Sequence, residues 1–299
     1  MISRVTGIVL IAFVVTSVAS TKQADTIGTA AGTISVRPIA HGTLALVLGR
    51  HVVVIDPARF VPGEPEPPPE DLQAMAKAYI ARVGAPPKPP ASPDEEPNPE
   101  LLVSALPIRP EQMARFRDIS PTVILVTHTH TDHLDPRVIA ALRTPQTRII
   151  VPPAAKGMLL DVRGAETIAN GGRITIGDVT IDAVPMYNTT SESQQGPVFH
   201  PKGRGNGYVI GFRGTRVYVA GDTGCTPEMQ ALSGVDAAFV PMNLPYTMSP
   251  DDAATCMKAM KPRIVYPYHY FGSDPAIFAD ALNGTGIEVR LRDWYEASQ

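Results

Sequence analysis

The sequence is poor in cysteine, in net charge and in long apolar runs. Two cysteines in 299 residues exclude a multi-disulfide framework and a zinc site built from four thiolates. The formal net charge of −3 excludes the strongly basic balance of a chain-wide nucleic-acid footprint, so we expect no nucleic-acid partner. With 44% hydrophobic and 18% charged residues, the chain has the composition of a globular protein with a sizeable core.

The one long apolar run lies at the N-terminus, where residues 1–19 predict a secretory signal peptide. Arg4 precedes a mostly apolar stretch, and Ser17 and Ala19 offer small side chains at the −3 and −1 positions of a cleavage site. The stretch is shorter than the roughly 20 residues that span a bilayer. We therefore expect a periplasmic or secreted protein without stable membrane insertion after cleavage. The alternative is an uncleaved segment that anchors the protein to a membrane.

Residues 20–299 predict one domain that carries a proline-rich insertion at residues 62–110. This insertion contains 14 of the 31 prolines, a composition that favours an extended surface segment over a packed core. Within it, residues 71–83 have apolar side chains at helical spacing, which predicts a helix that docks the insertion on the body. A linker between two domains is the alternative, but only a few strands precede it.

The remaining chain alternates predicted strands and helices, which indicates a layered α/β domain. Helices are expected to begin at Asp135-Pro136 and Ser249-Pro250, because Asp and Ser cap helices and proline suits the first helical position. Capping alone explains Asp135, so we interpret it as structural. Apolar and β-branched runs predict strands at residues 33–38, 43–48, 51–55, 122–127, 147–151, 179–185, 208–212, 217–220, 237–241 and 263–267.

Three histidines and an aspartate follow the predicted strand at residues 122–127. Side chains alternate along an extended segment, so His128, His130 and Asp132 can face the same way. His133 comes next, where the following helix approaches. Imidazole and carboxylate groups suit zinc and related metals. The spacing allows one metal to take His128 and His130, and a second metal to take Asp132 and His133.

This His-x-His-x-Asp-His pattern resembles the signature of the metallo-β-lactamase superfamily. Two later elements agree in order: Gly221-Asp222-Thr223 looks like the element whose aspartate bridges two metals, and the stretch around His269 (PYHY) looks like the one that supplies the last histidine. A carboxylate with two oxygens can join two cations at the roughly 3.5–4 Å spacing of two-metal sites. The resemblance therefore implies that Asp222 and His269 are metal ligands.

The resemblance covers residues 33–291 and implies a four-layer αββα sandwich with the metals at one edge between the sheets. Residues 242–250 (MNLPYTMSP) are similar to a stretch of one branch of the superfamily. That branch is typified by ascorbate-6-phosphate lactonase and by N-acyl phosphatidylethanolamine phospholipase D-like enzymes.

The third histidine of the first metal departs from the common pattern. In many relatives it follows the strand after the first motif, whereas here the strand at 179–185 runs into residues 186–188, which contain no histidine. Some relatives carry a loop similar to residues 198–203 (VFHPKG), which assigns His200 as this ligand. The alternative is a surface histidine and an incomplete metal shell.

A few further side chains are candidates for supporting roles. Lys202 and Arg204 are predicted to bind a phosphate or carboxylate of the substrate, unless they belong only to a solvated loop. Tyr246 is predicted to reach a bound oxyanion through its hydroxyl, with core packing as the alternative. His41 is a candidate for a supporting role in the pocket, since relatives often have Gly-His there, and His51 is interpreted as a turn residue.

Cys225 and Cys256 can pair after export if the fold brings them close enough. The sequence alone leaves their pairing open.

Together the motifs predict a metal-dependent hydrolase of a small-molecule substrate. Two divalent metals, zinc by default with manganese or iron as alternatives, would share a hydroxide that attacks an ester, lactone, amide or phosphodiester. Asp132 is the predicted catalytic residue, which holds or relays the proton. The alternatives are an iron-dependent oxidoreductase on the same fold and an exported non-catalytic protein with a degenerate metal site.

Overall fold

A computed structural model describes residues 25–29, 32–59, 108, 110–159, 164–189 and 198–295. The predicted signal peptide at 1–19 lies outside these residues, as does the helix expected at 71–83 with nearly all of the proline-rich insertion at 62–110. Within the described part of the chain, no helix combines the length and the apolarity that crossing a bilayer requires.

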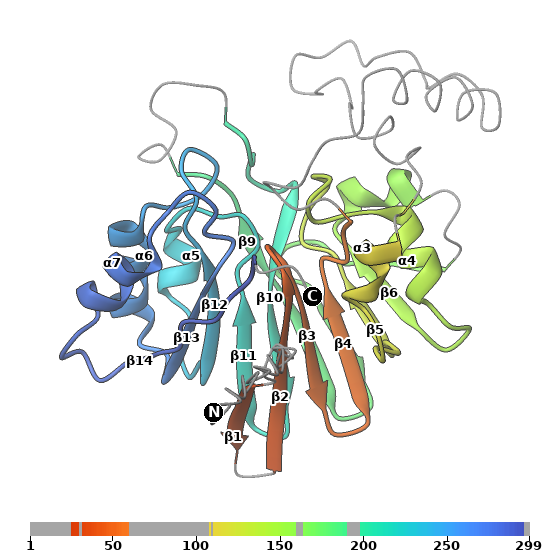
Figure 1. The fold of residues 1–299 in the computed structure, drawn as a ribbon, viewed down its shortest axis with the longest axis horizontal. Helices are drawn as coiled ribbons and strands as arrows, with labels where there is room; N and C mark the ends of the chain where they lie inside the picture. The colour runs from red at the N-terminus through yellow and green to blue at the C-terminus, as the bar shows by residue number, and fades with distance from the viewer. Residues whose placement is uncertain are drawn as a thin grey trace, which may run out of the picture.

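Two seven-stranded sheets face each other at the centre of the protein (Figure 1). In the first sheet, strands β1 to β4 are antiparallel, and β4 to β7 are parallel. These strands lie side by side in chain order: β1 (Asp25–Thr29), β2 (Gly32–Ala40), β3 (Thr43–Leu48), β4 (His51–Ile55), β5 (Val123–Leu125), β6 (Arg148–Val151) and β7 (Ala165–Thr167).

The second sheet repeats this plan. Strands β8 to β11 are antiparallel, and β11 to β14 are parallel. Its strands are β8 (Arg173–Ile176), β9 (Val179–Met186), β10 (Gly205–Phe212), β11 (Thr215–Val219), β12 (Ala237–Pro241), β13 (Ile264–Tyr268) and β14 (Glu288–Val289). Parallel neighbours need crossover connections, and several of these connections contain helices.

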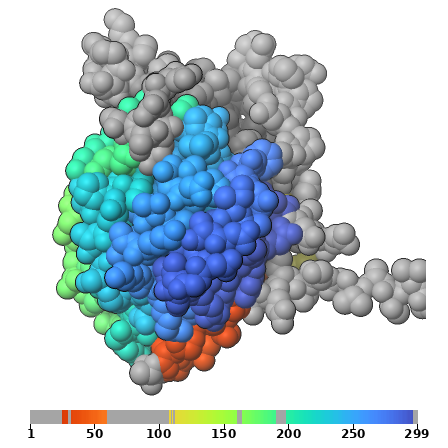
Figure 2. Space-filling model, turned by 90° about the vertical axis from the view of Figure 1, so that its left-hand side faces the viewer, coloured from red at the N-terminus to blue at the C-terminus, as the bar shows by residue number. Residues whose placement is uncertain are grey.

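Helices cover the outer face of each sheet (Figure 1). Those beside the first sheet are α3 (Pro110–Ala114) and α4 (Pro136–Leu142), with the 3₁₀ helix η1 (Pro153–Leu159) near β6. Those beside the second sheet are α5 (Pro227–Gln230), α6 (Pro250–Met260) and α7 (Pro275–Ala281). Figure 2 looks onto this second helical layer, where the blue C-terminal residues cover the face.

Three buried apolar clusters hold the layers together. The central cluster contains side chains of both sheets, such as Leu46 and Phe239, and also Trp294 near the C-terminus. One outer cluster joins the first sheet to α4, and the other joins the second sheet to α5, α6 and α7. The predicted αββα sandwich is therefore confirmed.

Local sequence signals placed several elements correctly. Asp135 caps α4 by accepting a hydrogen bond from Arg137 N, and Ser249 caps α6 by accepting one from Asp252 N. The strands expected at 43–48, 51–55 and 237–241 have the expected bounds. Strands β1, β7, β8 and β14 and helices α3, η1, α5 and α7 were not predicted. The four strands have two to five residues and lie at or next to sheet edges, where short strands have weak periodicity.

A disulfide joins Cys225, just before α5, to Cys256 of α6, with a Cα–Cα distance of 5.5 Å. The pairing that the sequence left open is thus present in the structure, and it ties together two helical segments of the outer layer.

Candidate metal centre

The predicted ligands converge at one edge of the sandwich, where strands of both sheets end. His128 follows β5 of the first sheet, whereas Asp222 follows β11 and His269 follows β13 of the second. In α/β sheets the carboxyl ends of strands are the usual location of ligand sites, because loops from neighbouring strands meet there. The sheets therefore position side chains that lie about 140 residues apart in sequence.

The first group of potential ligands consists of His128, His130, His200 and Asp222, whose ligand atoms all lie within 4.8 Å of one another. His200 Nε2 is 3.1 Å from His130 Nδ1 and 3.6 Å from Asp222 Oδ2. The loop histidine His200 thus stands beside the two histidines of the motif, as the sequence analysis expected.

The second group consists of His41, Asp132, His133 and His269, again within 4.8 Å of one another. Asp222 lies between the two groups. Its Oδ1 is 3.3 Å from His133 Nε2, and its Oδ2 is 3.2 Å from His269 Nε2. This arrangement fits the bridging role that the sequence predicted for Asp222.

Buried polar atoms without a hydrogen-bond partner test whether this cluster suits a metal. Buried unsatisfied groups are costly and rare, so several in one place need an explanation. Among the described residues, five such atoms gather here: His128 Nε2, His133 Nε2, both ring nitrogens of His269, and Asp222 Oδ1. Their lone pairs and the mixed imidazole–carboxylate set are what divalent zinc, iron or manganese would use. The residues therefore fit a metal site.

Asp56 orients two residues of the motif by hydrogen bonds, a role that its sequence position did not indicate. It directly follows β4, is fully buried, and accepts hydrogen bonds from Thr127 N at 2.6 Å, from Thr127 Oγ1 at 2.6 Å and from His133 Nδ1 at 2.8 Å. Burial raises the pKa of Asp56, and the donors from His133 and Thr127 oppose that rise. Because His133 donates through Nδ1, its Nε2 keeps the lone pair that a metal needs.

Thr127 extends the same network to the neighbouring ligand. Its hydroxyl donates to Asp56, and it therefore accepts from His128 Nδ1 at 2.9 Å. This hydrogen bond leaves His128 Nε2 unprotonated as well. The only sequence signal for Asp56 was its place directly after the strand predicted at residues 51–55 and before Pro57.

Asn188 holds His200. Asn188 Oδ1 accepts from His200 N at 2.9 Å and lies 3.1 Å from His200 Nδ1, while Asn188 Nδ2 donates to Tyr246 O at 2.8 Å. Tyr246 O lies 3.1 Å from the same His200 Nδ1. Both neighbours of Nδ1 are acceptors, so the proton resides on Nδ1 and the lone pair of Nε2 faces the first group.

Charge and burial act in opposite directions at the histidines. Burial lowers the pKa of His200 to about 3, so this ring is neutral. Burial also disfavours the charged form of His269, but Asp222 and Asp132 outweigh it and raise the pKa of His269 to about 9. His133 likewise has a raised pKa, because Asp222 and Asp132 overcome the effect of burial. In the metal-free protein, therefore, protons occupy part of the second group.

The side chains predicted to bind substrate, those of Lys202, Arg204 and Tyr246, are more exposed than the candidate metal ligands. Lys202 Nζ forms an ion pair with Glu228 at 2.6 Å, and Arg204 is exposed. Tyr246 is 45% exposed and packs edge-on against the ring of Phe199 at 4.8 Å between centroids. The hydroxyl of Tyr246 is thus accessible, whereas the charge of Lys202 is largely compensated.

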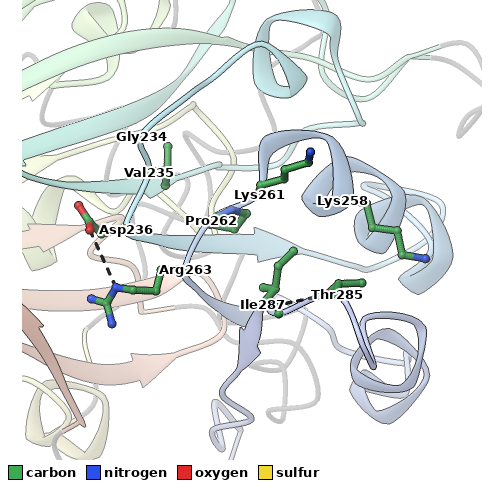
Figure 3. Close-up of a pocket in the computed structure, with 10 residues that line it drawn as sticks. Gly234, Val235, Asp236, Lys258, Lys261, Pro262, Arg263, Thr285 and Ile287 are labelled. Carbon is green, nitrogen blue, oxygen red and sulfur yellow. Dashed lines mark hydrogen bonds and ion pairs between the residues drawn. The ribbon is translucent and has the colours of Figure 1, made fainter.

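A shallow pocket of about 500 Å³ lies elsewhere, next to Asp236 and Arg263, which precede β12 and β13 (Figure 3). Lys258 and Lys261 also line it, and Arg263 lies 4.0 Å from Asp236. Because it adjoins the amino ends of these parallel strands, it is at the opposite edge from the ligand cluster and contributes nothing to it.

His51 is also remote from the cluster. It begins β4, and its Nε2 lies 2.9 Å from Asp178 Oδ1.

Comparisons with known proteins show to which family the chain is similar. The family model of the beta-lactamase superfamily domain matches residues 91–270. A UPF0173 metal-dependent hydrolase of Symbiobacterium thermophilum is 33% identical over 189 residues, which are 60% of this chain and 77% of the relative. Another of Deinococcus radiodurans is 27% identical over 213 residues, which are 67% of this chain and 89% of the relative.

Solved structures extend the similarity to nearly the whole chain. A candidate metal-dependent hydrolase from Parabacteroides distasonis is 31% identical with a TM-score of 0.66, over 92% of this chain and 99% of that one. The metallo hydrolase Igni18 from Ignicoccus hospitalis shares the fold, with 18% identity and a TM-score of 0.60 over 88% of this chain and 96% of that one.

Proposed function

The chain belongs to the beta-lactamase superfamily and is a metal-dependent hydrolase; from this premise, we propose that it binds two divalent cations, by default zinc, and hydrolyses an ester, lactone or phosphodiester. The main support for the proposal is the pair of ligand groups on either side of Asp222, which contain five buried polar atoms without a hydrogen-bond partner among the described residues.

When bound, two such cations supply an acidified water and a Lewis acid for the developing negative charge. His128, His130 and His200 would hold one cation, Asp132, His133 and His269 the other, with Asp222 shared by both. Five imidazoles with two carboxylates suit zinc, although manganese and iron accept the same ligands.

The chain's own side chains supply orientation and proton handling. Asp132 is the half-buried carboxylate of the second group, and its Oδ2 is close to the rings of His41, His133 and His269. From this position it can take the proton of the attacking water. Tyr246 is half-exposed and its backbone carbonyl lies 3.1 Å from His200 Nδ1, which supports a role for its hydroxyl as a donor to the oxyanion.

A non-catalytic protein on a degenerate site would lack part of the ligand set. The position of His200 beside His128 and His130 counts against that alternative.

Metal analysis and a hydrolysis screen with the full chain test the proposal. We expect about two zinc ions per chain and turnover of at least one probe among p-nitrophenyl acetate, γ-butyrolactone and bis(p-nitrophenyl) phosphate. Asp132→Ala should abolish turnover while the protein stays folded. Asp178→Ala is the matched control, because Asp178 is a carboxylate remote from the cluster that pairs with His51 and Arg213. Unchanged turnover in Asp132→Ala would overturn the proposal.

A further inference from the structure

His41 is a buried histidine at the metal centre whose part is not fixed by the motif. It lies in the turn between β2 and β3, is 1% exposed, and has a φ of +48°, a backbone conformation that favours glycine. Its ring is 3.6 Å from that of His269 between centroids. By distance alone it counts as a fourth member of the second ligand group.

The hydrogen bonds of Tyr295 determine which ring nitrogen of His41 carries the proton. Tyr295 OH accepts a hydrogen bond from Phe271 N at 2.9 Å and lies 2.7 Å from His41 Nδ1. With the backbone donor on its oxygen, the hydroxyl is left to donate its own proton to Nδ1. A neutral imidazole that accepts at Nδ1 carries its proton at Nε2.

That Nε2 proton is directed at Asp132. His41 Nε2 lies 3.1 Å from Asp132 Oδ2, and the carboxylate can only accept. A protonated ring nitrogen has no lone pair for a metal, so the same nitrogen cannot both donate to Asp132 and bind a cation. In the series of hydrogen bonds from Phe271 N through Tyr295 and His41 to Asp132, every donor therefore faces an acceptor.

Backbone contacts hold His41 in this position. His41 N donates to Trp294 O at 3.1 Å, and Trp294 is fully buried in the core between the sheets. His41 O accepts from His269 N at 3.3 Å. The turn is thus held by His269, which follows a strand of the second sheet, and by Trp294, which precedes Tyr295. These two hydrogen bonds account for a histidine with a positive φ.

From these contacts we propose that His41 is a positioning residue and not a metal ligand: Tyr295 sets its tautomer, and its Nε2–H holds Asp132 in place. The inference rests on the proposed function for the identity of Asp132 as ligand and proton acceptor. Side chains that orient metal ligands in this way contribute about 10- to 100-fold to metal affinity or activity.

The tautomer is directly measurable by long-range ¹H–¹⁵N correlation spectra of the ¹⁵N-histidine-labelled protein. The His41 signals are assigned by their loss in His41→Gln. We expect Nε2 of His41 to carry the proton in the metal-free protein and to keep it after zinc is added. Loss of that proton, with the shift of a zinc-bound nitrogen, would overturn the proposal and make His41 a ligand.

Metal titrations of variants supply the second readout. His41→Ala should still hold two zinc ions, with the weaker affinity reduced about 10- to 100-fold in chelator competition. His41→Gln should recover much of that loss because its amide keeps an N–H donor, and Tyr295→Phe should mix the two tautomers in the spectra. The matched controls are His51→Ala and Tyr266→Phe, which remove a buried imidazole and a tyrosine hydroxyl that bond to Asp178 and Asp25.

The outcomes separate this inference from the proposed function. Loss of one zinc ion in His41→Ala, or an unchanged affinity, would overturn the positioning role. Two zinc ions in the wild-type protein without hydrolysis of any probe would overturn the proposed hydrolysis alone, since the tautomer and affinity results would stand. Fewer than two zinc ions in the wild-type protein would overturn both.

Discussion

Replacing Asp56 with asparagine is expected to weaken the second metal site although Asp56 touches no metal. One oxygen of Asp56 accepts from Thr127 N, and the other accepts from both Thr127 Oγ1 and His133 Nδ1. Asparagine keeps the size but has only one acceptor atom, so in either orientation its NH₂ group meets a donor. When that group faces His133, the ring is driven to protonate at Nε2, which removes the lone pair meant for the metal.

The magnitude follows from these contacts. Losing a hydrogen bond that orients a metal ligand costs about 10- to 100-fold in metal affinity, or about 1.4–2.7 kcal/mol. A buried donor left facing another donor costs about 1–3 kcal/mol of folding stability. We therefore expect Asp56→Asn to lose both metal affinity and stability. Chelator competition measures the affinity, and urea unfolding of the metal-free protein measures the stability.

Asp135→Asn is the matched control for the loss of a buried carboxylate. Asp135 caps α4 and pairs with Arg59 at 2.8 Å, but it contacts none of the candidate ligands. This variant should lose stability and retain metal affinity. If Asp56→Asn binds zinc as tightly as the wild type, or if Asp135→Asn loses affinity equally, the orienting role of Asp56 is refuted.

Two further predictions concern the loaded site. At pH 7 the raised pKa of His269, about 9, keeps its ring protonated without metal, and the pKa of His133 is raised by the same carboxylates. Zinc binding should therefore release protons and tighten as pH rises towards 9. Calorimetry in buffers of different ionisation enthalpy measures the release, and no release would contradict this prediction. Gly221 has φ +65°, and a Cβ there would lie 2.6 Å from Met186 Sδ, so Gly221→Ala should reduce both folding stability and metal affinity. Gly214→Ala is the control, because Gly214 has φ +87° but open space around it, and it should reduce stability alone. Unchanged metal affinity in Gly221→Ala would show that close packing at Gly221 is not needed for the metal site.

The alternation of strands and helices predicted a layered α/β domain, and the resemblance of the histidine motif to the metallo-β-lactamase signature implied the αββα sandwich that the structure has. The motif from His128 to His133 sits directly after a buried strand, and the caps Asp135 and Ser249 mark helix starts by their own side-chain hydrogen bonds. Edge strands such as β8 were missed because their alternation is short and half-exposed. The branch of the superfamily stays a prediction.

The residues that support the ligands could not be predicted in the same way. Asp56, Asn188 and Tyr295 lie 77, 12 and 254 positions from the histidines they contact. No spacing rule connects such pairs, because only the packing of the two sheets brings them together. Each residue type also has an ordinary surface or turn interpretation, so its role appears only when its partner is known.

Strand direction explains why these supports occur where they do. Six strands end at the edge that carries the cluster: β2, β4 and β5 of the first sheet, and β9, β11 and β13 of the second. One residue of the site or of its supports follows each of these ends, in the order His41, Asp56, His128, Asn188, Asp222 and His269. His200 differs, because it precedes β10, which runs in the opposite direction. Asn188 lies just after β9, where the family resemblance led us to look for the third histidine, and it bonds to His200 through both the backbone N–H and the ring. Asn188 at the end of β9 thus holds the ring of His200 in position, so that a histidine from the loop before β10 joins the first group.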